Sequence, residues 1–205
     1  MSHGYAAVTE GGGGLMDKAL ARRLLDEIGR EMADKGLVAE IAIYGGVAML
    51  LQFGTRAATR DIDFTHLEGE AKTLHQVANQ VGARHGMPEG WFNDSVRMFT
   101  SDRPDLLPYG DFPAGGRAGL RVMLPSPRYI LAMKLMAMRS PLETNDMRDV
   151  WDLLDECNIK TADEAAGWFS HFYGGDKMPP DKEAKLRDLV ADKVAGIAYD
   201  PMRHW

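Results

Sequence analysis

The sequence has almost no cysteine and no long apolar run, and each absence excludes a class of protein. Cys157 is the only cysteine among the 205 residues, so an intramolecular disulfide is excluded and a reducing compartment is favoured. No apolar run approaches the roughly 20 residues that a transmembrane helix needs, and no secretory signal is recognisable. We therefore expect a cytoplasmic protein with no membrane partner.

Basic residues are also in short supply. The chain has 24 Lys and Arg against 30 Asp and Glu, which is a formal net charge of −6. This balance weighs against a broad surface that coats nucleic acid, because phosphate binding relies on Lys and Arg, although a local basic cleft stays open. Hydrophobic residues make up 45 % of the chain, enough for one globular domain or for a core with a small helical lobe.

Residues 41–64 carry the strongest functional signal. An apolar run at 41–43 indicates a strand, and it ends at Gly45 and Gly46. Apolar residues at helical spacing follow over 47–51 and predict a short helix. Glycines admit a ligand close to the backbone, and the first amide groups of a helix are unpaired, so this turn can bind an anion. A Gly-Gly pair is also an ordinary turn, and that interpretation stays open.

Asp61 and Asp63 follow, on a second predicted strand. Alternate residues of a strand share a face, so the two carboxylates point the same way and repel each other. A divalent cation between them would relieve the repulsion, and Mg²⁺ is usually held by one or two carboxylates plus substrate phosphates. The alternative is a solvated strand end. The order of the features along the chain nevertheless matches that of a nucleotidyl transfer site: first the glycine turn, then Arg56 and Thr59, then the acidic pair.

This stretch resembles the first motif of the DNA polymerase β-type nucleotidyltransferase superfamily. The residues that carry the resemblance are Gly45, Gly46, Leu50, Arg56, Thr59 and Asp61-Ile62-Asp63. The AbiEii-like toxins of bacterial abortive-infection and toxin–antitoxin systems, with their uncharacterised bacterial relatives, are the most similar branch. The resemblance implies transfer of a nucleoside monophosphate from a nucleoside triphosphate (NTP), with Mg²⁺ or Mn²⁺ as cofactor. It also implies an antitoxin partner and an acceptor such as RNA (for example a tRNA end), a protein or a small molecule.

The implied fold is α/β (α+β), the nucleotidyltransferase fold, with a small mixed sheet flanked by helices and a C-terminal helical region. We expect a flexible tail at 1–14, the nucleotidyltransferase core at 15–125, and a helical region packed on the core at 126–205. The core should open with a helix at 15–35, because its apolar residues form one stripe. Further helices are expected near 68–84, 161–172 and 181–195.

A lysine lies in a strongly apolar helix predicted over residues 126–139. Ser126 and Pro127 suit its first turn, and its body is apolar almost all round, so the helix should be buried. A buried Lys134 needs a partner, either the acidic pair or the phosphates of a nucleotide. The alternative is an ammonium group that reaches solvent. The resemblance assigns this lysine to the active site, and Arg139 one turn later to the nucleotide.

Asn145 is expected to cap the next helix, with Asp146 and Asp149 in its first turn. Acids are favourable there because of the helix dipole. The resemblance gives the same Asp-x-x-Asp pair a supporting role, in which it positions the preceding basic helix. Cys157 completes the buried stripe of this helix and is expected to be a core thiol rather than a nucleophile.

The turn-rich region 86–118 is harder to interpret. We expect one strand at 96–99, and we interpret residues 91–94 as a buried aromatic pair followed by an Asx turn, although a similar Asn-Asp element occurs in the resembling family. Family members place a third carboxylate on a later strand, expected here at 120–124. That position holds Arg121, and the nearest acids, Asp102 and Asp111, fall in expected loops.

Two hypotheses follow. In the first, the protein is a nucleotidyltransferase in which two carboxylates bind metal and act in catalysis together with a lysine, while glycines and cations bind the nucleotide. In the second, the lost third carboxylate marks a catalytically degenerate protein of this fold that binds a nucleotide or a partner. The residues of the first hypothesis are Asp61, Asp63 and Lys134 for catalysis, and Gly45, Gly46, Arg56, Thr59, Lys134 and Arg139 for the nucleotide.

Overall fold

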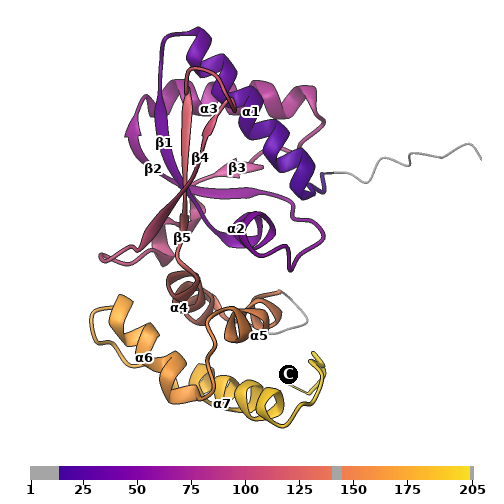
Figure 1. Cartoon of the computed structure of the whole chain (residues 1–205), viewed down its shortest axis with the longest axis vertical. Helices are drawn as coiled ribbons and strands as arrows, with labels where there is room; N and C mark the ends of the chain where they lie inside the picture. Colours follow the sequence, from indigo (N-terminus) through magenta and orange to yellow (C-terminus); the bar gives the residue numbers. More distant parts are fainter. Residues whose placement is uncertain (1–13, 140–144, 204–205) are drawn as a thin grey trace, which may run out of the picture.

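The structure is a computed structural model that describes residues 14–139 and 145–203. It contains a five-stranded mixed sheet with helices packed against it and a group of helices at the C-terminal end (Figure 1). The expected fold class, a mixed sheet flanked by helices with a C-terminal helical region, is confirmed. Residues 1–13 of the expected tail lie outside the described residues.

The expected helices agree with the structure to within three residues, and the helix expected from 68 begins at 71 because the preceding strand continues to Gly69. No helix in the described ranges is long and apolar enough to cross a membrane. The elements are α1 (Lys18–Asp34), β1 (Ala39–Ile43), α2 (Gly45–Gln52), β2 (Ile62–Gly69), α3 (Ala71–Arg84), β3 (Phe92–Asn93), the 3₁₀ helix η1 (Ser95–Phe99), β4 (Leu106–Phe112), β5 (Leu120–Pro125), α4 (Pro127–Ala137), α5 (Asp146–Glu156), α6 (Ala162–Phe172) and α7 (Pro180–Val194).

The strand predicted at 96–99 is wrong, because these residues form η1. The Oδ1 atom of Asn93 accepts a hydrogen bond from the backbone N–H of Ser95 (3.0 Å), which turns the chain into the 3₁₀ helix. In such a helix residues three apart share a face, so Val96 and Phe99 lie together, whereas Met98 is 80 % exposed. The Asx turn expected after the buried aromatic pair is confirmed.

β3 and β4 are not predicted from the sequence. A two-residue strand such as β3 has no detectable periodicity, and Pro108 and Gly110 obscure the alternation of β4. Proline is tolerated there because β4 is the edge of the sheet, which has the order β3-β2-β1-β5-β4. Asp111 therefore lies in a strand, opposite Arg121 of β5, and not in a loop as expected.

Strand register brings the glycine turn and the acidic pair to the same end of the sheet. β1 runs antiparallel to β2 and parallel to β5. Ile43 is paired with Phe64, and the backbone N–H of Tyr44 donates to the carbonyl of Asp63 (2.8 Å). The point where β1 ends is thus directly beside the point where β2 begins, and Gly45 and Asp61 lie at that edge.

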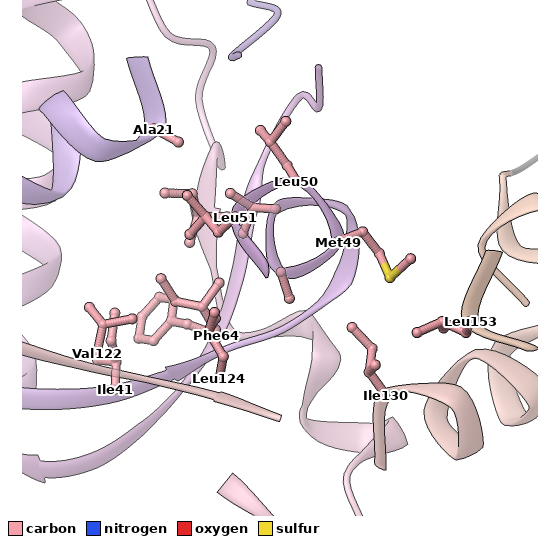
Figure 2. Packing of buried hydrophobic residues seen from close by; sticks show 14 of the residues in the cluster. Ala21, Ile41, Met49, Leu50, Leu51, Phe64, Val122, Leu124, Ile130 and Leu153 are labelled. Atoms are coloured by element: carbon pink, nitrogen blue, oxygen red, sulfur yellow. The ribbon is translucent and has the colours of Figure 1, made fainter. Parts of the chain in front are cut away.

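The short helix α2 connects the sheet to the C-terminal helices. Its residues from Gly46 to Leu51 are all buried, because the helix has apolar neighbours on every side. In Figure 2 the side chain of Met49 points toward Ile130 of α4 and Leu153 of α5, while Leu51 lies on the side of the sheet. Residues of the C-terminal helices and of the sheet region belong to one apolar cluster.

Close helix–strand packing at Gly29 gives the first testable prediction. A Cβ atom at Gly29 in α1 would overlap the backbone carbonyl group of Phe112 in β4, which cannot move aside without distorting the sheet. Gly29→Ala should therefore lower the free energy of unfolding by about 1–3 kcal/mol, the usual cost of overpacking, although alanine is the better helix former. Urea unfolding measures this difference.

Gly167 in α6 provides the matched control, because no atom lies within 4 Å of the position that its Cβ would occupy. Gly167→Ala should leave the protein unchanged or stabilise it by about 0.4–1 kcal/mol, since the unfolded chain loses conformational freedom. Equal effects of the two substitutions would contradict the packing described between α1 and β4.

Candidate functional site

A cavity of about 280 Å³ opens at the end of the sheet where β1 ends and β2 begins. Its polar lining comes from segments far apart in the sequence, namely the glycine turn, the acidic pair, the lysine helix and the first turn of α5. Its apolar lining comes from η1 and α4. The polar residues are Gly45, Asp61, Asp63, Ser95, Lys134, Arg139 and Asp146, and the apolar ones include Val96, Phe99, Ile130 and Met133.

Gly45 and Asp63 are fitted closely to each other. Gly45 has a φ of +64°, a conformation that favours glycine, and a Cβ atom there would lie 2.5 Å from Oδ2 of Asp63. The absence of a side chain therefore lets the carboxylate approach the backbone at the start of α2. This is the close approach that the sequence led us to expect for a ligand, and in the structure Asp63 itself makes it.

Gly46, Arg56 and Thr59 lie behind the glycine turn, and none of them is among the described residues that line the cavity. A Cβ atom at Gly46 would lie 2.6 Å from Oγ1 of Thr59 and 2.7 Å from Nη1 of Arg56. Thr59 is buried and its backbone forms an isolated β-bridge with Met16. The structure thus places these three expected nucleotide contacts against α2 as support for the turn.

Asp63 is held in an environment that disfavours its charge. Burial raises the pKa of the Asp63 carboxyl, and the neighbouring charge of Asp61 raises it further. A side-chain hydrogen bond with Asn93 and the positive charge of Lys134 act in the opposite direction without cancelling the rise. The acidic pair is therefore under electrostatic strain of the kind that a divalent cation relieves.

Lys134 is buried, as the apolar helix predicted, and it is only 8 % exposed. Its Nζ lies 2.7 Å from Oδ2 of Asp149 and 3.1 Å from Oδ1 of Asp146. The acidic pair, one of the two expected partners, is thus not the direct contact of the ammonium group, and the ammonium does not lie in open solvent. The pair on α5 neutralises the lysine, while Lys134 still lines the cavity.

Asp149 is the most deeply buried charged group of this cluster, with 1 % of its side chain exposed. The guanidinium of Arg56 donates to both of its carboxylate oxygens, from Nε (2.9 Å) and from Nη2. Burial would lower the pKa of Arg56, but these hydrogen bonds and the charge of Asp149 raise it overall, so the arginine stays charged. Asp146 pairs with Lys134 and also with Arg139, whose Nε lies 3.6 Å from Oδ2 of Asp146.

Two smaller expectations concern α5 itself. Asn145 is its N-cap residue, as expected, but only its backbone carbonyl takes part, accepting from the N–H of Asp149 (2.8 Å), since its side chain makes no capping hydrogen bond. Asp146 and Asp149 occupy the first turn, where the helix dipole favours their charges. Cys157 is the C-cap residue of α5 and is partly buried against the core, and this burial raises the pKa of its thiol to about 11.

Arg121 is far from the cavity edge, so its position in the sheet does not bear on the acidic pair. It is paired with Glu40 of β1 and Asp111 of β4, toward the starts of the two parallel strands β1 and β5, whereas Gly45 follows the end of β1. The strand neighbour of Asp63 is Asn93 of β3. Only the Asn-Asp element of residues 91–94 could have indicated this neighbour from the sequence.

The residues of the cavity fit a metal that arrives with phosphates. No group of three or more His, Cys, Asp or Glu side chains suited to a metal ion occurs in the described part of the chain. Asp146 also lines the cavity but is paired with Lys134 and Arg139, so the donor set is the two carboxylates of Asp61 and Asp63. This set is small for a resident metal, but it is the number that Mg²⁺ commonly uses when substrate phosphates complete its coordination.

Comparisons with protein-family models, with curated proteins and with solved structures find no match for this chain. The class of protein is accordingly inferred from the chemistry of the cavity.

The raised pKa of Asp63 predicts how stability depends on pH. The folded protein binds a proton at Asp63 more readily than the unfolded chain does, so this carboxyl lowers stability as pH rises from its ordinary pKa of 3.8 through the higher folded value. Asp63→Asn removes this loss. In EDTA, urea unfolding should show the variant gaining stability over the wild type at pH 7 and little at pH 4, whereas a difference independent of pH would contradict the assignment.

The shared carboxylate of Asp149 predicts a large loss of stability. Asp149→Asn leaves Lys134 and Arg56 buried without their common anion, and breaking a buried pair costs about 3–5 kcal/mol. Asp152→Asn is the matched control on the same helix, because its partner Arg148 is half-exposed and such a pair contributes only about 0.3–0.5 kcal/mol. Urea unfolding of both variants should separate them, and a similar small loss for each would refute the central role of Asp149.

Proposed function

We propose that the protein is a nucleotidyltransferase that uses Mg²⁺ or Mn²⁺ to transfer a nucleoside monophosphate from an NTP to a hydroxyl group of an acceptor. One observation carries the proposal. Asp61, Asp63 and Gly45 line the same cavity as Lys134 and Arg139. Carboxylates that can hold a cation thus share one cavity with side chains that can hold phosphates.

The basic side chains of the cavity, Arg139 and Lys134, would bind the triphosphate together. Arg139 is 65 % exposed and its contact with Asp146 is long, at 3.6 Å, so its guanidinium can turn to phosphate oxygens. Lys134 already has two carboxylate partners, and it would add its charge from a fixed position. Charge-assisted hydrogen bonds of this kind are strong, and donors fixed in advance stabilise developing charge without reorganisation.

The reaction then follows from the groups that line the cavity. The acceptor oxygen forms a bond to the α-phosphorus, and the bond from that phosphorus to the bridging oxygen breaks, so pyrophosphate leaves with the electron pair. A carboxylate oxygen of the acidic pair takes the hydroxyl proton. The bound cation would reduce the electrostatic repulsion between the acceptor oxygen and the negatively charged phosphates.

The resemblance to the AbiEii-like branch supports a more specific proposal. The protein would be the toxin of a toxin–antitoxin or abortive-infection module, with an antitoxin protein as its partner. The acceptor would be an RNA such as a tRNA end, a protein hydroxyl or a small molecule.

A second function is favoured by one observation, namely that the strand neighbour of Asp63 is the neutral Asn93 and not an acid. A site with two carboxylates would then bind an NTP or a partner without transferring anything. Metal-dependent NTP binding with no labelled product in any acceptor mixture would favour this second candidate.

Removal of both carboxylates tests the proposal. Asp61→Asn combined with Asp63→Asn should abolish Mg²⁺-dependent stabilisation by NTPs in a thermal-shift assay, and also transfer of label from [α-³²P]NTP to acceptors in a cell lysate. The fold should remain, because the substitution removes a repulsive pair.

The control is Asp102→Asn with Asp105→Asn, which removes the same charge from the exposed segment between η1 and β4 and should leave binding and transfer intact. Wild-type binding and transfer by the folded Asp61/Asp63 double variant would refute the proposal.

A further inference from the structure

We propose that Asn93 is a positioning residue that holds the carboxylate of Asp63 and limits the metal site to two negative charges. A site of that charge takes up a divalent cation together with a triphosphate and retains a free cation only weakly. The inference rests on the proposed function, because it concerns the same cavity.

Strand pairing places Asn93 directly beside Asp63. β3 runs parallel to β2, with Phe92 opposite Ile62 and Asn93 opposite Asp63. The ring of Phe92 stacks on Phe64 in the core, with centroids 4.1 Å apart, which fixes the face that each residue of β3 presents. Since successive side chains point to opposite faces, Asn93 shares the face of Asp63, about 4.8 Å away across the pair.

The orientation of the Asn93 amide is determined by its partners. Its Oδ1 accepts a hydrogen bond from the backbone N–H of Ser95 (3.0 Å), so this atom must be the oxygen. Its Nδ2 donates to the carbonyl oxygen of Gly90 (3.2 Å). The second hydrogen on Nδ2 is available to the carboxylate of Asp63, the partner of Asn93 across the two strands.

An aspartate at this position would keep the contact with Ser95 and lose the contacts with Gly90 and Asp63. It would still accept from Ser95, because aspartate forms the same Asx turn as asparagine. It could not donate to Gly90 or to Asp63, and it would place a third negative charge beside the acidic pair. Asp63 has no room to retreat, since its Oδ2 already lies against the backbone of Gly45.

The charge of a metal site helps to set its affinity for the free cation. With two carboxylates and a neutral amide, the cavity relies on phosphate oxygens to complete the coordination of Mg²⁺. A third carboxylate would hold the cation without a nucleotide. The amide of Asn93 thus matches the site to a metal–nucleotide complex as its ligand.

The substitution Asn93→Asp changes the charge of the metal site but keeps the Asx turn with Ser95, so it tests the two roles of Asn93 separately. In EDTA its melting temperature should fall by about 3 °C or more, since each kcal/mol corresponds to about 2–4 °C in a chain of this size. Saturating Mn²⁺ without nucleotide should restore the melting temperature. The variant should bind Mn²⁺ about tenfold more tightly than the wild type, as read from the electron paramagnetic resonance signal of free Mn²⁺.

Two further variants serve as controls. Asn93→Ala removes the turn contact with Ser95, so its melting temperature should fall in EDTA and stay low in Mn²⁺. Asn79→Asp adds the same charge on the exposed face of α3 and should change neither the melting temperature nor the Mn²⁺ affinity.

The outcomes of the two proposals are distinguishable. If the protein transfers no nucleotide but Asn93→Asp still binds Mn²⁺ more tightly than the wild type, the proposed transfer fails and the role of Asn93 stands. If Asn93→Asp gains no Mn²⁺ affinity, or loses stability that Mn²⁺ does not restore, the role of Asn93 is overturned whatever the transfer assay gives.

Discussion

The buried carboxylate of Asp149 is the interaction on which the cavity depends. It accepts hydrogen bonds from Arg56, which follows α2, and it forms an ion pair with Lys134 of α4. A buried charge is tolerated only when it is paired, so these three residues can be buried together but not separately. The first turn of α5 is thereby tied both to the segment behind the glycine turn and to the lysine helix, and the C-terminal helices are fixed against the core at the cavity.

This pairing also defines the charge that a ligand meets. The cluster of Arg56, Lys134, Arg139, Asp146 and Asp149 has three positive and two negative groups, a net charge of +1. The acidic pair, Asp61 and Asp63, brings the whole to −1 when both are ionised. A divalent cation would reverse the sign to +1. An anionic nucleotide is therefore electrostatically favoured only with its metal, which agrees with the limit that we assign to Asn93.

Close backbone approaches make this arrangement possible and also make it rigid. Gly45 lies against Asp63, and Gly46 lies against Thr59 and Arg56, so both glycines are occupied by the protein's own side chains. The short helix that begins with these two glycines, α2, is apolar all round because it packs on the sheet and on α4 and α5 at once (Figure 2). The two halves of the molecule are thus joined by apolar packing at α2 and by ion pairs at Asp149.

The sequence by itself determined the fold class, and it pointed to Gly45, Asp61, Asp63 and Lys134, because helical stripes, strand alternation and a glycine turn are properties of neighbouring residues. It missed β3 and β4, whose short length or Pro and Gly content hides any periodicity. Only the tertiary structure decided that Asp149 pairs with Lys134, that Arg56 lies behind the turn, that Asn93 lies beside Asp63 and that Arg121 lies far away. These facts depend on register and on contacts between segments distant along the chain, which local periodicity does not encode.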